Sequence, residues 1–181
     1  MIFIGQQHIM NELGVLLPHL YKTGEPHNIM IRGASGYGKT RLALLISNYL
    51  ADRNFYMCVG NTFTYVPDMH VQLIDECHLV DPAEILYPYM DNKQHIFVLT
   101  SNDASQIKEA LLNRCTRFQF TDYSNPELAQ IISKASTFKL SQEQINYLIE
   151  SGGGNPRIIL NLVSRLNILK NSSYRMETLE E

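Results

Sequence analysis

The segment GASGYGKT, residues 33–40, follows the short apolar run NIMI and precedes the amphipathic stretch RLALLISNYL. Its three glycines and one lysine restrict the local fold strongly, because glycine adopts backbone angles that other residues avoid. The backbone N–H groups of such a loop can converge on a phosphate chain at the N-terminus of the following helix. The segment therefore predicts a strand, a phosphate-binding loop and a helix, in that order.

The polar side chains of this loop have distinct expected roles. Lys39 is expected to reach the β- and γ-phosphates as a point charge, and the Thr40 hydroxyl is expected to bind Mg²⁺. The alternative, a glycine-rich turn with a surface lysine, is disfavoured because the whole pattern matches between a strand and a helix. The expected nucleotide-binding residues of this region are Gly33, Ala34, Ser35, Gly36, Tyr37, Gly38, Lys39, Thr40 and Arg41.

Strands and helices alternate along most of the chain. Apolar spacing predicts strands at 28–31, 55–59, 71–75, 95–101 and 117–120. Helical spacing covers 6–22, 40–53, 81–90 and 104–114, and Pro88 is expected to end or bend the third of these helices. This alternation predicts an α/β fold, with a parallel five-stranded sheet that has helices on both faces.

After Tyr123 the pattern changes to helices alone, at 126–136, 141–151 and 156–169. The change predicts two domains, an α/β nucleotide-binding domain over 1–123 and a small all-α domain over 124–181. The acidic end METLEE is expected to be frayed.

Composition narrows the class of protein. The formal net charge is −3 and the Lys and Arg residues are scattered, so any contact with nucleic acid must be local. No apolar run is long enough for a membrane span and no leader pattern opens the chain, which favours a cytoplasmic protein without membrane contact. Cys58, Cys77 and Cys115 lack the spacing of a disulfide framework or a zinc site, and we expect reduced thiols.

A second polar group follows the apolar strand VQLID. Asp75 and Glu76 stand at its carboxyl end, which in a parallel sheet lies beside the phosphate loop. Asp75 is expected to hold the hydration shell of Mg²⁺, and Glu76 to polarise an attacking water, a role worth ~10²–10⁴-fold in rate. The alternative is an acidic pair that merely ends a strand at a solvated loop. The nearby phosphate loop favours the catalytic interpretation over this alternative.

Asn102 follows the next strand, FVLTS, and is expected within reach of the γ-phosphate and the water. Thr100 and Ser101 are close substitutes for this role. A Ser-Asn-Asp sequence also ends many strands simply because these residues form turns.

Five motifs in this order resemble those of the AAA+ ATPases: GASGYGKT, LIDECH, the LTSN strand, NRC at 113–115 and GNPR at 154–157. FIGQ at 3–6, DECH and EILYPYM at 84–90 are similar to the Holliday-junction branch-migration (RuvB) branch, whereas NRC resembles the Ser-Arg-Cys motif of clamp-loader subunits. The likeness extends from Phe3 to about Leu169. It implies a P-loop AAA+ module followed by a helical lid.

The resemblance also implies roles for individual residues. Gly33 to Thr40 correspond to Walker A, Asp75 and Glu76 to Walker B, and Asn102 to sensor 1. Arg114 corresponds to an arginine finger that acts on a neighbouring subunit, although an arginine at a helix end can also simply extend its charge into solvent.

Two further roles are implied at the two ends of the likeness. Arg157 corresponds to sensor 2 in the lid, and its charge near a helix start is mildly unfavourable, which hints at a ligand. Phe3 and Ile4 are implied to line the adenine pocket, and an apolar segment packed on the domain is an equally good interpretation.

The chain departs from the family in two places. Only thirty residues separate Thr40 from Val71, so the usual helix between these strands, which often faces DNA, is expected to be short or absent. We also expect no winged-helix or collar domain after the last helix, and thus a bare ATPase module.

The implied function is ATP hydrolysis with Mg²⁺ at the subunit interfaces of a homo-oligomeric ring or spiral. Such a loader or motor would serve DNA replication or recombination, on DNA directly or through a sliding clamp, a helicase or a junction-binding protein. The alternative is a nucleotide-dependent assembly switch that recruits a partner and hydrolyses ATP only to reset. A small P-loop kinase also fits the length, but the apolar-striped helical region and the Asp-Glu pair suit it less.

Overall fold

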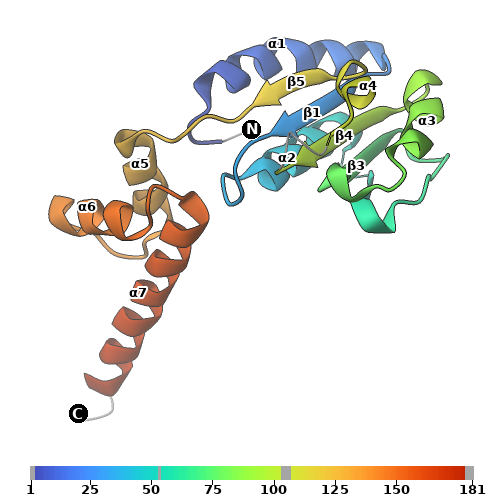
Figure 1. Cartoon of the computed structure of the whole chain (residues 1–181). Coiled ribbons are helices and arrows are strands. Elements are labelled where there is room, and N and C mark those ends of the chain that lie inside the picture. The colour runs from blue at the N-terminus through green and yellow to red at the C-terminus, as the bar shows by residue number, and fades with distance from the viewer. Residues whose placement is uncertain (1–2, 53, 103–106, 178–181) are drawn as a thin grey trace. The chain divides into compact units, whose positions relative to one another are not determined.

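The computed structural model describes residues 3–52, 54–102 and 107–177, with the backbone alone over 171–177 (Figure 1). Internal contacts divide the chain into two units, Met1–Thr121 and Asp122–Glu181, just before the boundary expected at Tyr123. Among the described residues, no helix has both the length and the apolar character that a membrane span requires.

The first unit contains a five-stranded sheet in which every pairing is parallel, as the sequence predicts. Its strand order is β2-β3-β4-β1-β5, so β1 lies between β4 and β5 (Figure 1). Because all strands point the same way, the segments that follow β1, β3 and β4 meet at one edge of the sheet. The strands are β1 Asn28–Arg32, β2 Tyr56–Val59, β3 Val71–Asp75, β4 Ile96–Ser101 and β5 Thr116–Gln119.

Helices cover both faces of this sheet and bury its apolar side chains. The helices α1 (Gln7–Thr23) and α2 (Lys39–Ala51) pack on one face through Ile9, Leu13, Leu42 and Ile46. The other face is covered by shorter elements, which enclose a second cluster around Met30, Ile74, Leu86, Phe97 and Leu111. These shorter elements are α3 Tyr87–Asp91, α4 Glu109–Leu112 and the 3-10 turns η2 Cys77–Leu79 and η3 Ala83–Leu86.

Two of the predicted helices differ from the structure. The helix expected over 81–90 is divided into η3 and α3. Pro88 lies in the first turn of α3, where the proline costs no hydrogen bond because N–H groups in this turn have no partner within the helix. Of the helix expected over 104–114, only Glu109–Leu112 is helical within the described residues, and 104–106 lie outside them.

The connection between β2 and β3 contains only the 3-10 turn η1, Gly60–Thr62, so the expected shortening of a helix here is confirmed. An aromatic cluster holds the remainder of this connection. The Tyr65 ring stacks on Tyr89 with centroids 3.9 Å apart, and the Tyr65 hydroxyl lies 2.6 Å from His95 Nε2. The short connection is therefore anchored by packing on α3 and on His95, the residue just before β4.

The second unit consists of three helices, α5 (Asn125–Ala135), α6 (Gln142–Ser151) and α7 (Pro156–Glu177). The helices α5 and α6 begin with capping boxes, at Ser124 and Ser141, which satisfy N–H groups of their first turns. The helix α7 continues past residue 169, where the apolar pattern ends, and includes the first two residues of the METLEE segment; residues 178–181 lie outside the described ones. The buried side chains of these helices include Leu128, Ile132, Ile145, Leu148, Ile149, Ile159 and Val163.

Candidate nucleotide-binding site

The glycine-rich loop lies between the end of β1 and the start of α2, as the sequence predicts. Gly38 occupies the N-cap of α2 with φ 97°, a left-handed conformation that a side chain would strain. The loop therefore delivers Lys39 and Thr40 into the first turn of α2, where the positive end of the helix dipole also lies. Ala34 and Ser35 are exposed, Gly36 and Tyr37 are half-buried, Gly33 is buried, and Arg41 is exposed on α2.

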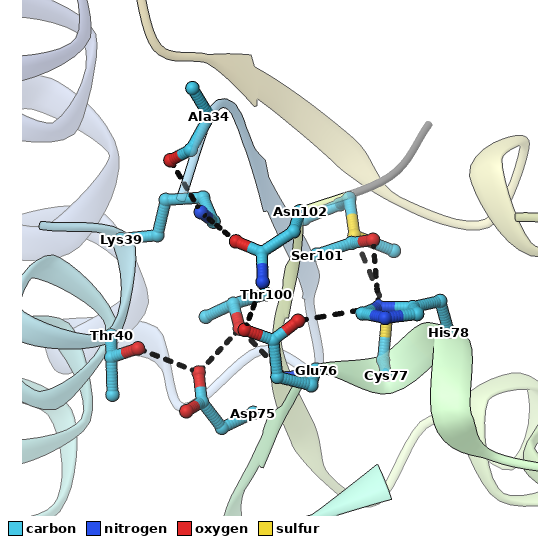
Figure 2. Close-up of polar contacts among 11 residues, drawn as sticks. Ala34, Lys39, Thr40, Asp75, Glu76, Cys77, His78, Thr100, Ser101 and Asn102 are labelled. Carbon is cyan, nitrogen blue, oxygen red and sulfur yellow. Dashed lines mark hydrogen bonds and ion pairs between the residues drawn. The ribbon is translucent and has the colours of Figure 1, made fainter. Parts of the chain in front are cut away.

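Lys39 is the buried cation of this site. Its side chain is only 5% exposed, and its ammonium group donates to the Ala34 carbonyl oxygen at 2.9 Å and to Asn102 Oδ1 (Figure 2). A buried ammonium needs such oxygen partners, because desolvation without them is costly. Phosphate oxygens held by the loop would offer the same kind of partner with a full negative charge.

Asp75 joins the first turn of α2 to two strand ends. Its Oδ1 accepts hydrogen bonds from Thr40 Oγ1 at 2.8 Å and from Thr100 Oγ1 at 2.5 Å (Figure 2). The same Thr100 hydroxyl accepts from the Glu76 backbone N–H at 3.0 Å. Thr100 is completely buried and thus fixes both carboxylate-bearing residues to the end of β4.

The carboxylate of Asp75 and the hydroxyl of Thr40 are hard oxygen donors, which suit Mg²⁺. Within the described residues no group of three or more His, Cys, Asp or Glu side chains could hold a metal alone. Magnesium sites in proteins commonly take one or two protein ligands and complete their shell with phosphate oxygens and water.

Glu76 turns away from the strand in a left-handed conformation, with φ 52° and ψ 51°. Such a conformation is strained for a side chain other than glycine and is often found at functional sites. Glu76 Oε1 accepts a hydrogen bond from Asn102 Nδ2, so Asn102 lies between Lys39 and the Glu76 carboxylate (Figure 2). The structure thus places the predicted Walker A, Walker B and sensor 1 residues in one continuous polar network.

The sequence interpretation did not single out His78, which also contacts this network. His78 Nδ1 lies 3.4 Å from Glu76 Oε2 and 3.2 Å from Ser101 Oγ. The DECH motif shows that His78 stands three residues after the end of the strand, but the motif alone does not show which residues the histidine contacts. Thr100 was considered only as a substitute for Asn102, so its hydrogen bonds to Asp75 and to the Glu76 N–H were also missed.

The N-terminal residues Phe3 and Ile4 are half-buried in the described structure. The Phe3 ring lies edge-on to Phe120 with centroids 5.9 Å apart, and Phe120 contacts the loop at Gly33. The adjacent Gln6 side chain donates to the Thr121 carbonyl at 2.8 Å and accepts from the Thr121 N–H at 2.9 Å. This segment therefore packs next to the start of the phosphate loop, and its contact with adenine remains a prediction.

Arg114 lies outside this network, just before β5 and hence at the amino edge of the sheet. Its Nε and Nη2 donate to the two carboxylate oxygens of Asp91 at 2.9 and 3.0 Å, and Nη1 donates to the Ala110 carbonyl at 2.7 Å. The guanidinium also lies 4.4 Å from the centroid of the Tyr87 ring. The hydrogen bonds to Asp91 raise the pKa of Arg114 further above its usual value.

Arg157 belongs to the second unit, where it is exposed in the first turn of α7. Its backbone N–H donates to Asn155 Oδ1 at 3.0 Å. Its proposed contact with nucleotide remains a prediction.

The cysteines are buried at Cys58 and Cys77 and half-buried at Cys115, in line with the expected reduced, partly buried thiols. Burial raises the pKa of Cys115 to about 12 and that of Cys77 further still, so neither is a thiolate near neutral pH. The three cysteines are all free in the structure.

The sheet order, the phosphate loop after the interior strand β1 and the following helical unit define a P-loop AAA+ fold. Comparison with solved structures agrees: the Thermotoga maritima RuvB Holliday junction branch migration motor matches with a TM-score of 0.78 at 22% identity, over 93% of this chain and 65% of that one. A single-residue variant of the same protein reaches a TM-score of 0.83 at 22% identity, over 95% of this chain and 65% of that one.

Among curated proteins, the chain is similar to subunits named Holliday junction branch migration complex subunit RuvB. The protein from Sulfurimonas denitrificans is 29% identical over 201 residues, which cover 91% of this chain and 59% of the relative. The protein from Nitratiruptor sp. is 29% identical over 202 residues, with 91% and 60% covered. The chain thus spans 59–60% of the length of these relatives. No family model matches the chain. The resemblance to the RuvB branch of AAA+ ATPases is confirmed.

Proposed function

We propose that this chain binds ATP with Mg²⁺ and hydrolyses it at the carboxyl edge of the sheet in its first unit. The observation that carries this proposal is the continuous network from Lys39 through Asn102 to Glu76, beside Asp75 and Thr40. It joins a phosphate-binding cation, a water-orienting carboxylate and a pair of magnesium donors at one end of one sheet.

In this proposal each residue of the network acts on a different part of the reaction. Lys39 neutralises the β- and γ-phosphates, Glu76 orients and polarises the attacking water, and Asn102 holds Glu76 at a fixed position relative to Lys39. Thr40 and Asp75 would hold Mg²⁺, which would supply positive charge to neutralise the charge that develops on the phosphates. A carboxylate aimed at water favours hydrolysis over the kinase alternative.

The names of the relatives suggest the biological task. RuvB is a subunit of a Holliday junction branch migration complex, and we propose that this chain likewise acts as an ATP-driven oligomer on branched DNA during recombination. In a head-to-tail assembly, Arg114 would stabilise the transition state in the neighbouring subunit. The partner in this proposal is a sliding clamp, a helicase or a junction-binding protein.

The ATPase assignment is tested by separating binding from turnover. Lys39→Ala should lose binding of a fluorescent ATP analogue, because Lys39 meets phosphate in the ground state. Glu76→Gln should bind the analogue as the wild type does and lose turnover, because the glutamate acts on water. Turnover by Glu76→Gln near the wild-type rate would overturn the role of Glu76.

The DNA task is tested by measuring steady-state ATP turnover with a four-way junction, with linear duplex of the same sequence, and with no DNA. A junction-specific motor should turn over ATP fastest with the junction. An assembly switch would instead show nucleotide-dependent oligomers in sedimentation and a low turnover that no DNA changes. The second outcome would favour the alternative function.

Arg157 is proposed to contact the nucleotide from the helical unit, so that this unit responds to ATP and ADP differently. Arg157→Ala should then blunt the difference in hydrogen exchange over residues 125–170 between the two nucleotide states. If the variant keeps the full difference, Arg157 has no role as a nucleotide sensor.

A further inference from the structure

His78 is almost buried beside the carboxylate that we propose to activate water. Its side chain is only 11% exposed, and it projects from η2 toward both Glu76 and Ser101 (Figure 2). His78 Nδ1 lies 3.4 Å from Glu76 Oε2 and 3.2 Å from Ser101 Oγ. One ring nitrogen therefore faces two oxygen atoms that come from the ends of two neighbouring strands.

The two oxygens of Glu76 differ in their surroundings. Oε1 accepts a hydrogen bond from Asn102, whereas Oε2 is buried and has no hydrogen-bond partner within the described part of the chain. A buried carboxylate oxygen without a donor is costly, and His78 Nδ1 is placed to supply one. If Nδ1 carried no proton, its lone pair would instead face the carboxylate.

We propose that His78 carries a proton on Nδ1 and is a positioning residue for Glu76. This inference rests on the proposed ATP hydrolysis and adds to it the group that fixes the orientation of the water-activating carboxylate. The separation of 3.4 Å is longer than an ordinary hydrogen bond, and such contacts tighten when the reacting groups are bound.

The contact gives Glu76 two links to the same strand. Asn102 binds Oε1 directly, and the single Nδ1 proton of His78 would be shared between Oε2 and the Oγ of Ser101, the residue immediately before Asn102. Two links on two different oxygens fix the rotation of the carboxylate about its own axis, which one link leaves free. This matters because a small misplacement of a reacting group can cost ~10²-fold in rate.

The test compares two amide substitutions at His78. An asparagine places its amide nitrogen near the position of Nδ1, whereas a glutamine places it near Nε2. His78→Gln and His78→Ala should lower kcat by ~10–100-fold while the affinity for a non-hydrolysable ATP analogue is unchanged. His78→Asn should keep most of the turnover. His70→Asn, at an exposed histidine outside the site, is the matched control and should behave as the wild type.

Three results would overturn the proposal. Asparagine and glutamine variants with equal turnover would show that the Nδ1 position does not matter. A loss of analogue binding that matches the loss of kcat would indicate a general structural role. Full turnover of His78→Ala would show that no positioning is needed.

The second measurement is independent of ATP turnover. Nitrogen NMR of ¹⁵N-histidine protein, with His78 assigned by the signals missing from His78→Asn, should show a protonated Nδ1, and Glu76→Gln should shift that signal. A neutral His78 protonated only on Nε2 would overturn the inference. If the wild-type protein hydrolyses no ATP, the proposed function fails on that assay, while the NMR result still decides the contact between His78 and Glu76.

Discussion

The first unit holds two cations, for which we propose functions, in different ways at opposite edges of one sheet. Lys39, at the carboxyl edge, is buried, and its partner Asn102 comes from a distant strand end. Arg114, at the amino edge, is 30% exposed and is bound by Asp91 and Ala110 from the short elements α3 and α4. Buried charges need their partners, whereas exposed ion pairs contribute little to stability.

This difference agrees with the roles that we propose for the two cations. A residue that acts on the nucleotide of its own subunit can be built into a rigid network. A residue that acts on a neighbouring subunit must be able to leave its own chain, and the partly exposed contact of Arg114 with Asp91 should break more easily than the buried contacts of Lys39. The predictions below test whether the two edges differ in this way.

The largest effect on ATP turnover is expected for a substitution of Arg114. Arg114→Ala should bind ATP and lose ~10³–10⁵-fold in turnover if the arginine stabilises the transition state of a neighbour. Mixing it with Glu76→Gln should partly restore activity, because some interfaces then combine an intact Glu76 with an intact Arg114. Recovery should rise with protein concentration, as assembly does.

Sedimentation of the same mixture is the control, since it shows whether the two variants assemble together. A mixture that assembles and stays as inactive as either parent would mean that Arg114 does not act between independently firing sites.

The next largest effect on turnover is expected for Thr100, at the carboxyl edge of the sheet. Thr100→Val keeps the shape of the side chain but removes the hydroxyl that binds Asp75 and the Glu76 N–H. Leaving these buried groups without a partner should lower the free energy of unfolding by ~1–3 kcal/mol. Turnover should fall by ~10–100-fold, as when a group that orients a metal ligand is removed.

Thr100→Ser is the matched control for this change, because it retains the hydroxyl. Denaturant unfolding and steady-state turnover measure the two effects. Equal behaviour of the valine and serine variants would show that the buried hydroxyl does not organise the site.

The difference between local sequence pattern and long-range contact explains how much of the structure could be predicted from the sequence. The phosphate loop and the Asp75–Glu76 pair are contiguous in the chain and each follows an apolar strand, so local pattern alone located them. Alternating strands and helices gave the parallel sheet, but the position of β1 between β4 and β5 depends on long-range pairing that alternation does not encode.

Other parts of the structure depend on contacts that no local pattern carries. The bond between Arg114 and Asp91 joins residues in different elements, and the predicted continuous helix over 81–90 gave Asp91 no defined position. The helix α7 was predicted to end near 169 because the apolar spacing stops there, yet a polar sequence can continue a helix that is already nucleated.

A smaller effect is expected at Gly60, which supports the strained turn at Glu76. A Cβ atom at Gly60 would lie 2.4 Å from the Glu76 carbonyl oxygen, a backbone atom that cannot move aside easily. Gly60→Ala should therefore cost ~1–3 kcal/mol of unfolding free energy. Displacement of Glu76 should also lower turnover by about tenfold or less, within the effect of a small misplacement.

Gly14→Ala is the control for this substitution, because its Cβ would meet no atom within 4 Å on the exposed side of α1. It should be neutral or stabilising by roughly 0.5–1 kcal/mol, as alanine favours a helix interior. Thermal unfolding that ranks the two variants equally would contradict the tight approach of Gly60 to Glu76.

The smallest effect is expected at Asp91, and its direction decides what this carboxylate does. Asp91 occupies one edge of the Arg114 guanidinium, so the contact competes with any neighbour that needs the same edge. Asp91→Asn keeps the shape of the side chain but removes its charge, which weakens the contact with Arg114. Half-maximal turnover should then be reached at a few-fold lower protein concentration, because Arg114 is more available to a neighbouring subunit. The free energy of unfolding should change little. Turnover measured over a concentration series tests this. If Asp91→Asn instead lowers the turnover reached at saturating concentration, Asp91 orients Arg114 for its neighbour, and the amino edge is as rigidly built as the carboxyl edge.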